Sequence, residues 1–101
     1  MRVLIIDDEP LACERIRTLL ADEPGIEVLG ECHDGRSAVT AIRNLAPELV
    51  FLDVQMPEMD GFAVLQQFAP EYLPISAILP LAVHGAAAIL LLQLLLLEQV
   101  Q

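Results

Sequence analysis

The chain has 101 residues, which is enough for one domain with a single hydrophobic core. Fifteen acidic residues against five basic ones give a formal net charge of −10. Such a charge argues against contact with the phosphate backbone of a nucleic acid, so we expect no direct nucleic-acid binding by this chain.

The first residues indicate a strand and not a secretory signal, because one arginine is followed by four apolar residues and then by acids. Without such a signal, Cys13 and Cys32 are expected to be reduced structural thiols, not a disulfide. These features predict a cytoplasmic protein.

The first predicted element is a strand over residues 2–6. Pro10 fits the first turn of the helix that follows. Apolar residues recur in that helix at helical spacing: Leu11, Ile16, Leu19 and Leu20. Residues 26–32 then alternate apolar and acidic side chains, which predicts an edge strand with one solvent-exposed face.

A second helix is predicted over residues 37–45 and a third strand, buried on both faces, over residues 48–52. The third helix is expected over residues 61–68, with four apolar positions toward the sheet: Phe62, Val64, Leu65 and Phe68. Residues 73–79 fit a fourth strand. The order βαβαβα predicts an α/β fold, a doubly wound parallel sheet with strand order 2-1-3.

Acidic residues follow two strands that this order makes neighbours. Asp7 and Asp8 come directly after the first strand, and Asp53 follows the third at the start of a tight, acid-lined loop. In open α/β sheets, ligands bind outside the carboxyl ends of the strands. Three gathered carboxylates repel one another unless their pKa values rise or a hard divalent cation binds, and we expect the cation. Taken alone, the Asp7-Asp8 pair fits an acidic cap of the first helix.

Two segments carry a family resemblance: residues 3–12 (VLIIDDEPLA) and residues 51–61 (FLDVQMPEMDG). Together they resemble the receiver domain of bacterial two-component response regulators, whose fold is flavodoxin-like. The opening Asp-Glu-Pro-Leu-Ala is most similar to receivers that precede LytTR-type DNA-binding domains. The resemblance covers residues 2 to about 74.

This resemblance implies that Asp53 accepts a phosphoryl group from a sensor histidine kinase. It also implies direct Mg²⁺ ligands in the carboxylates of Asp8 and Asp53 and the backbone carbonyl of Gln55, with Asp7 acting through a water molecule. Such a chain is a self-phosphorylating acceptor and not an enzyme with an external substrate. The effector domain of such regulators is expected to be absent from this chain.

The sequence departs from the family after Pro74. A complete receiver has a serine or threonine at the end of its fourth strand and a lysine at the end of its fifth. The hydroxyl position falls near Pro80 or Leu81, and the lysine falls just past the end of this lysine-free chain. We therefore expect a truncated receiver over residues 1–79, a non-family, apolar, helical tail over residues 80–101, and a defective switch. Either the reading frame or gene end was disrupted, or the receiver is degenerate; the leucine and alanine crowding favours disruption.

Two alternatives from other classes stay open. A Mg²⁺-dependent hydrolase with an aspartyl-phosphate intermediate usually has a second aspartate two residues after the nucleophile, where this chain has Gln55. A non-catalytic interaction or membrane-associated module would use residues 82–97. These are 16 residues, fewer than the roughly 20 that a membrane span needs, which favours a buried helix.

Overall fold

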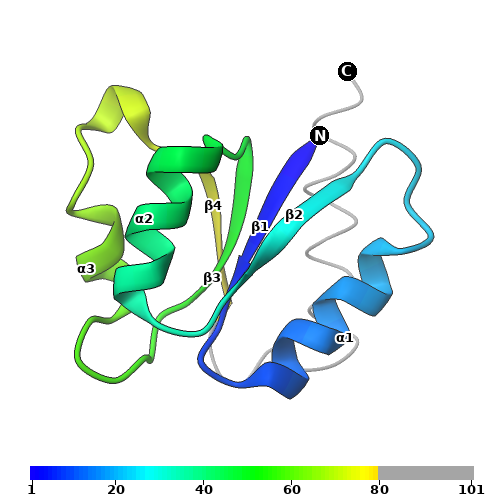
Figure 1. The fold of residues 1–101 in the computed structure, drawn as a ribbon, viewed down its shortest axis with the longest axis horizontal. Coiled ribbons are helices and arrows are strands. Elements are labelled where there is room, and N and C mark those ends of the chain that lie inside the picture. Colours follow the sequence, from blue (N-terminus) through cyan, green and yellow to red (C-terminus); the bar gives the residue numbers. More distant parts are fainter. Residues whose placement is uncertain (80–101) are drawn as a thin grey trace.

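The structure, a computed structural model, describes residues 1–79, which form an α/β fold around a parallel sheet (Figure 1). The strands are β1 (Arg2–Ile6), β2 (Glu27–Cys32), β3 (Leu49–Asp53) and β4 (Ile75–Leu79). The helices are α1 (Pro10–Leu20), α2 (Gly35–Leu45), α3 (Gly61–Leu65) and the 3₁₀-helix η1 (Pro70–Tyr72). Within the described residues the strand order is β2-β1-β3-β4, so the predicted 2-1-3 arrangement and the fourth strand are confirmed.

Two hydrophobic clusters lie on opposite faces of the sheet, because successive side chains of a strand point to opposite faces. Helix α1 covers one face, and α2 and α3 cover the other (Figure 1). The buried residues of the α1 face are Val3, Ile5, Cys13, Ile16, Leu20, Leu49 and Phe51. Those of the α2 face are Leu4, Ile6, Cys32, Ala38, Val39, Ile42, Val50, Leu52, Met56 and Val64. The central strands β1 and β3 contribute to both clusters, which explains their continuous apolar runs.

Both cysteines are free and buried, as predicted. Cys13 belongs to the cluster under α1, whereas Cys32 belongs to the cluster under α2 and α3. Burial raises the pKa of the Cys13 thiol to about 12, so without a bound metal ion the thiol is protonated at neutral pH.

Helix α2 begins at Gly35, two residues earlier than predicted, because Asp34 is its N-cap. The Asp34 carboxylate accepts a hydrogen bond of 2.8 Å from the backbone N–H of Ser37. Helix α3 ends at Leu65 and not at Phe68 as predicted. The proline at position 70 disfavours helical geometry at the residue before it, and the backbone there is extended (φ −66°, ψ 148°).

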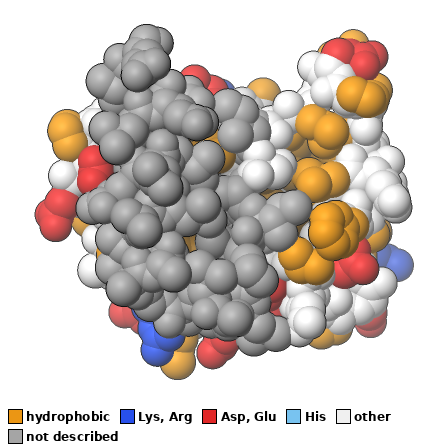
Figure 2. All heavy atoms as spheres, turned by 180° about the vertical axis from the view of Figure 1, so that it is seen from behind, with side chains coloured by type: hydrophobic (Ala, Val, Ile, Leu, Met, Phe, Trp, Pro, Cys, Tyr) orange, Lys and Arg blue, Asp and Glu red, His pale blue; other side chains and the backbone are white. Residues whose placement is uncertain are grey.

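Leu11 and Phe62 are exposed, although the periodicity assigned them to buried helix faces. The side chains of Leu11 and Phe62 are 60% and 51% exposed, each in the first turn of its helix. Figure 2, the view from behind, shows hydrophobic side chains along its right-hand side. Tyr72 and Leu73 are further large apolar residues that are exposed. Helical periodicity therefore predicted the burial of Val64 correctly, but not the exposure of Leu11 and Phe62 in the first turns of their helices.

The predicted helical tail, residues 80–101, lies outside the described residues, and so do Pro80 and Leu81 at the expected hydroxyl position. Within residues 1–79, every helix is too short or too polar to cross a membrane.

Candidate functional site

The three predicted acidic residues meet at the carboxyl edge of the sheet. Strands β1 and β3 are parallel neighbours with Ile6 in register with Leu52, so Asp7 and Asp53 follow side by side. Carboxylate oxygens of Asp7, Asp8 and Asp53 all lie within 4.8 Å of one another. The proximity predicted from the sequence is confirmed, and the roles of these residues as ligands or acceptor stay predictions.

Backbone N–H groups orient the two buried carboxylates. Asp7 and Asp53 are 3% and 8% exposed, whereas Asp8 is exposed. The Oδ1 atom of Asp7 accepts a hydrogen bond of 2.9 Å from the N–H of Glu9. The Oδ1 atom of Asp53 accepts one of 3.1 Å from the N–H of Gln55. This contact places Gln55 beside Asp53, and the metal role of the Gln55 carbonyl oxygen stays a prediction.

The alternative interpretation of Asp7 and Asp8 as the cap of α1 is wrong. The N-cap residue of that helix is Glu9, whose own side chain makes no capping hydrogen bond, and the first turn contains no acid. Neither Asp7 nor Asp8 is the N-cap residue, so helix capping does not explain why the three carboxylates lie together.

Burial and mutual repulsion make the ionised form of this cluster unfavourable. Burial raises the pKa of Asp7 to about 6, although the Glu9 N–H opposes the shift, and the charges of Asp53 and Asp8 raise it further. Burial also raises the pKa of Asp53, with a further contribution from the charge of Asp8. Within residues 1–79 the ion pairs join Arg17 and His33 to Glu31, so no described basic side chain neutralises the cluster. A group of three carboxylates whose negative charge no described basic side chain neutralises suits Mg²⁺ or another hard cation.

The shifted pKa of Asp7 predicts a pH-dependent stability in metal-free buffer. Its folded-state value of about 6 exceeds the ordinary value of 3.8, so between these values the folded protein binds more protons than the unfolded chain. The free energy of unfolding therefore falls as pH rises through this window and stays low above it. Asp7→Asn should raise this free energy by on the order of 2–3 kcal/mol near neutral pH, and by little below the window.

Urea denaturation at a series of pH values, with a chelator present, measures this effect. Asp22→Asn is the matched control, because Asp22 is exposed and lies outside the cluster. An equal gain from Asp7→Asn at acidic and neutral pH would show that ionisation of Asp7 is not the cause.

The loop after β3 is held tightly against Asp53. Glu58 adopts a positive φ of 67°, and the N–H of Met59 donates to the carbonyl of Pro57 over 2.7 Å. The N–H of Gly61 then donates to the carbonyl of Val54 over 3.1 Å. A Cβ atom at Gly61 would lie 2.5 Å from the carbonyl oxygen of Asp53. Helix α3 can therefore begin this close to Asp53 only with glycine at this position.

We expect Gly61→Ala to lower the free energy of unfolding by about 1–3 kcal/mol, because the added methyl group must displace backbone atoms and not a flexible side chain. Chemical denaturation measures the change. Gly30→Ala is the control: a Cβ atom there meets nothing within 4 Å, so stability should stay the same or rise by up to about 1 kcal/mol. A destabilisation equal to that of Gly61→Ala would contradict the steric explanation.

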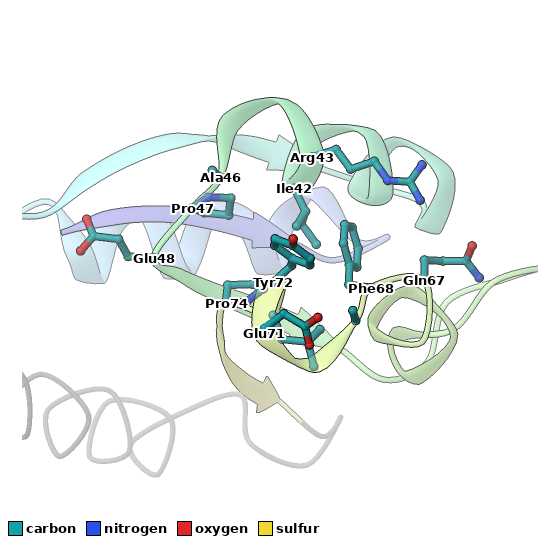
Figure 3. A pocket seen from close by; sticks show the side chains of 12 residues that line it. Ile42, Arg43, Ala46, Pro47, Glu48, Gln67, Phe68, Glu71, Tyr72 and Pro74 are labelled. Atoms are coloured by element: carbon teal, nitrogen blue, oxygen red, sulfur yellow. The ribbon is translucent and has the colours of Figure 1, made fainter.

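One groove lies away from the acidic cluster, near the amino ends of β3 and β4 (Figure 3). It has a volume of about 680 Å³, and the aromatic rings of Phe68 and Tyr72 lie in it. The guanidinium of Arg43 stacks over the Phe68 ring, 5.5 Å from its centroid. None of the three clustered aspartates lines this groove, so it is not part of the acidic site.

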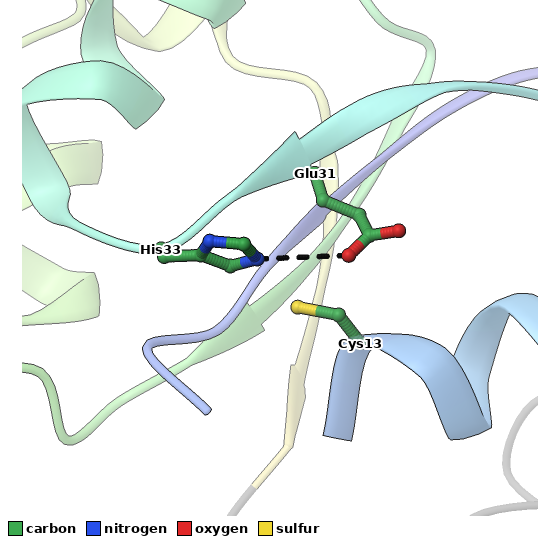
Figure 4. Close-up of side chains that lie close together, drawn as sticks. All are labelled: Cys13, Glu31 and His33. Atoms are coloured by element: carbon green, nitrogen blue, oxygen red, sulfur yellow. Dashed lines mark ion pairs between the residues drawn. The ribbon is translucent and has the colours of Figure 1, made fainter. Parts of the chain in front are cut away.

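A second cluster of potential ligands was not predicted from the sequence. Cys13, Glu31 and His33 come from α1, β2 and the residue after β2, and their ligand atoms lie within 4.8 Å of one another (Figure 4). Only the packing of α1 over the edge strand brings them together. The sequence signal that could have indicated this cluster was a glutamate and a histidine two positions apart at the end of a predicted strand, Glu31 and His33.

Comparison with known proteins gives consistent matches. The family model for the response regulator receiver domain matches residues 3–91, so the match extends beyond residue 74, where the resemblance was expected to end. The transcriptional regulatory protein BtsR of Salmonella typhi is 43% identical over 74 residues, which are 73% of this chain and 31% of BtsR. The protein-glutamate methylesterase/protein-glutamine glutaminase 5 of Anaeromyxobacter dehalogenans is 39% identical over 87 residues, covering 85% of this chain and 24% of that protein.

Solved structures agree with this fold. The response regulator domain of Thermotoga maritima CheB superposes with a TM-score of 0.73 at 25% identity, covering 93% of this chain and 70% of that one. The signal receiver domain of the putative response regulator NarL from Mycobacterium tuberculosis gives a TM-score of 0.68 at 33% identity, covering 92% of this chain and 74% of that one. The chain spans about a third of the length of BtsR, at 31%.

Proposed function

The chain belongs to the response regulator receiver domain family, and from this premise we propose that it accepts a phosphoryl group on Asp53 in a Mg²⁺-dependent reaction. The observation that carries the proposal is the position of Asp53. It ends a fully buried strand, is held by a backbone N–H, and lies within 4.8 Å of two further carboxylates.

In the proposed reaction, a carboxylate oxygen of Asp53 attacks the phosphorus of a phosphohistidine on a partner kinase. The new P–O bond forms as the P–N bond breaks, and the histidine nitrogen leaves with the electron pair. Asp8 and Asp53 would hold the Mg²⁺ directly together with the carbonyl of Gln55, and Asp7 would act through a water molecule. When bound, Mg²⁺ neutralises negative charge that spreads over the phosphoryl oxygens.

The finer assignment within the family is a receiver of the type that precedes LytTR DNA-binding domains. The Asp-Glu-Pro-Leu-Ala sequence at residues 8–12 and the similarity to a transcriptional regulatory protein support it. A histidine kinase is the proposed partner, and the proposed location is the cytoplasm, which the two free, buried thiols support. The net charge of −10 supports an output that does not rely on DNA contacts by this chain.

Labelling with acetyl phosphate tests the proposal. With Mg²⁺ present, the protein should acquire one acid-stable, hydroxylamine-sensitive phosphoryl group, and without Mg²⁺ it should acquire none. A non-catalytic interaction module would not be labelled under either condition. Steady release of phosphate from added phosphoesters would instead indicate a hydrolase, although Gln55 stands where such enzymes usually have a second aspartate.

We further propose that phosphorylation does not drive the usual conformational switch. Neither residue at the expected hydroxyl position, Pro80 or Leu81, can donate a side-chain hydrogen bond to the phosphoryl group. A charge-assisted hydrogen bond of this kind contributes roughly 1.5–3 kcal/mol. Moving the populations of the inactive and active conformations from 99:1 to 1:99 requires about 5.5 kcal/mol. A ligand shifts an equilibrium only by its different interactions with the two states, so much of the bias is missing.

Amide NMR spectra with and without a beryllofluoride mimic of the phosphoryl group test this second proposal. Changes should stay close to Asp7, Asp8 and Asp53. Large changes across β4 and the residues that follow it would show that the switch operates by other contacts.

A further inference from the structure

The α1 face of the molecule carries a thiol, a carboxylate and an imidazole that the proposed phosphoryl transfer does not use. In Figure 4 the Cys13 thiol points from α1 toward the side chains of Glu31 and His33 on β2 and just beyond it. The three ligand atoms lie within 4.8 Å of one another. Cys13 is fully buried, whereas the side chains of Glu31 and His33 are 25% and 47% exposed, so solvent reaches the cluster from one side.

The carboxylate of Glu31 is already oriented by the guanidinium group of Arg17. The Nε atom of Arg17 contacts Oε2 of Glu31 at 2.7 Å. The other oxygen, Oε1, lies 3.6 Å from Nε2 of His33, which is too long for a good hydrogen bond. A tetrahedral ion with bonds of about 2.0–2.1 Å holds neighbouring nitrogen and oxygen ligands about 3.4 Å apart. The separation of these two atoms is therefore close to that of two ligands of one tetrahedral ion.

We propose that Cys13, Glu31 and His33 bind Zn²⁺ or a transition-metal ion of similar softness, with water as the fourth ligand. One sulfur, one nitrogen and one oxygen ligand are a set that Zn²⁺ accepts and Mg²⁺ does not favour. Binding releases the thiol proton to solvent, because a coordinated thiol is deprotonated by the charge of the ion. The all-oxygen acidic cluster and this mixed cluster thus select different classes of metal.

The two clusters also share a contact. The Cys13 thiol donates to the backbone carbonyl of Asp7 with a separation of 3.5 Å. Coordination through the thiolate removes this hydrogen bond, so occupancy of the mixed site changes the surroundings of the acidic one. The binding itself does not depend on the proposed phosphoryl transfer and can be measured without a phosphodonor.

Titration with Co²⁺, a spectroscopic substitute for Zn²⁺, tests the site in the whole chain with excess Mg²⁺ present. The wild-type protein should develop a thiolate-to-cobalt charge-transfer band at one equivalent, and Zn²⁺ should remove it. Cys13→Ala should abolish the band. His33→Gln should weaken Co²⁺ binding by more than about tenfold, because tenfold is the lower limit of the loss seen when a residue that only orients a metal ligand is replaced. Cys32→Ala is the matched control, because its thiol lies in the other cluster, and it should keep the band.

Absence of a charge-transfer band in the wild-type protein would overturn the proposal. So would a band that survives in Cys13→Ala and is lost in Cys32→Ala. If Cys13→Ala does not fold, unchanged Co²⁺ affinity in His33→Gln would be sufficient to reject the site, since His33 is half exposed and can be replaced without disturbing the core. Asp8→Asn should leave the band intact, which distinguishes this site from the acidic cluster.

Discussion

Asp53→Asn should abolish phosphoryl labelling completely, because an amide has no nucleophilic carboxylate oxygen although its shape is nearly the same. No other described acid combines the end of a buried strand with two neighbouring carboxylates. The measurement is mass spectrometry of the protein after incubation with acetyl phosphate and Mg²⁺, followed by mapping of the modified residue. We expect one adduct on the wild-type protein, at Asp53, and none on the variant.

Asp60→Asn is the matched control for this experiment. Asp60 lies in the same loop but is exposed, and its carboxylate accepts a hydrogen bond from the N–H of Ala63 as the N-cap of α3. Asparagine caps helices about as well as aspartate does, so the fold and the labelling should both be retained. An adduct on Asp60, or labelling that survives in Asp53→Asn, would exclude Asp53 as the acceptor.

The second large effect concerns the metal. Asp8→Ala should weaken Mg²⁺ binding by more than about 100-fold, because the loss of a direct ligand exceeds the 10–100-fold cost of losing an outer-shell contact. The loss of Mg²⁺ affinity in Asp7→Ala should be in the 10–100-fold range. Asp7 is 3% exposed, and one of its carboxylate oxygens already accepts a hydrogen bond from the Glu9 N–H. Isothermal titration calorimetry with Mg²⁺ measures both affinities.

Stability of the same variants provides the internal control. Each substitution removes one of three repelling carboxylates, so neither variant should be less stable than the wild-type protein in metal-free buffer. A loss of Mg²⁺ affinity then reflects the missing ligand and not unfolding. Equal Mg²⁺ affinities for the two variants would contradict the assignment of Asp8 as the direct ligand.

The sheet could be predicted from the sequence because its central strands are short apolar runs with nothing polar inside them. Residues 2–6 match β1, and β3 differs from its predicted range by one residue at each end. The helices were harder to predict. Periodicity gives the direction of a side chain, but the exposure of Leu11 and Phe62 depends on what lies against the first turn, and this is a tertiary property.

The acidic cluster was predictable for a simple reason: its members follow strands that must be neighbours in a right-handed parallel fold. The mixed cluster of Cys13, Glu31 and His33 was not, because it depends on how α1 crosses the edge strand. The close approach of Gly61 to Asp53 could not be predicted either, since glycine before an apolar helix indicates only a turn. Contacts between elements, and not the elements themselves, are what the sequence alone left open.

The contact between Gly61 and Asp53 also has a mechanical consequence. Because the first residue of α3 abuts the backbone carbonyl of Asp53, a movement of that carbonyl toward α3 must displace the start of the helix. Phe62 is the next residue and is half exposed, so its ring would travel with any such displacement. The exposed aromatic side chain is therefore linked to Asp53 through one peptide bond, between Gly61 and Phe62, and one steric contact, between Gly61 and the Asp53 carbonyl.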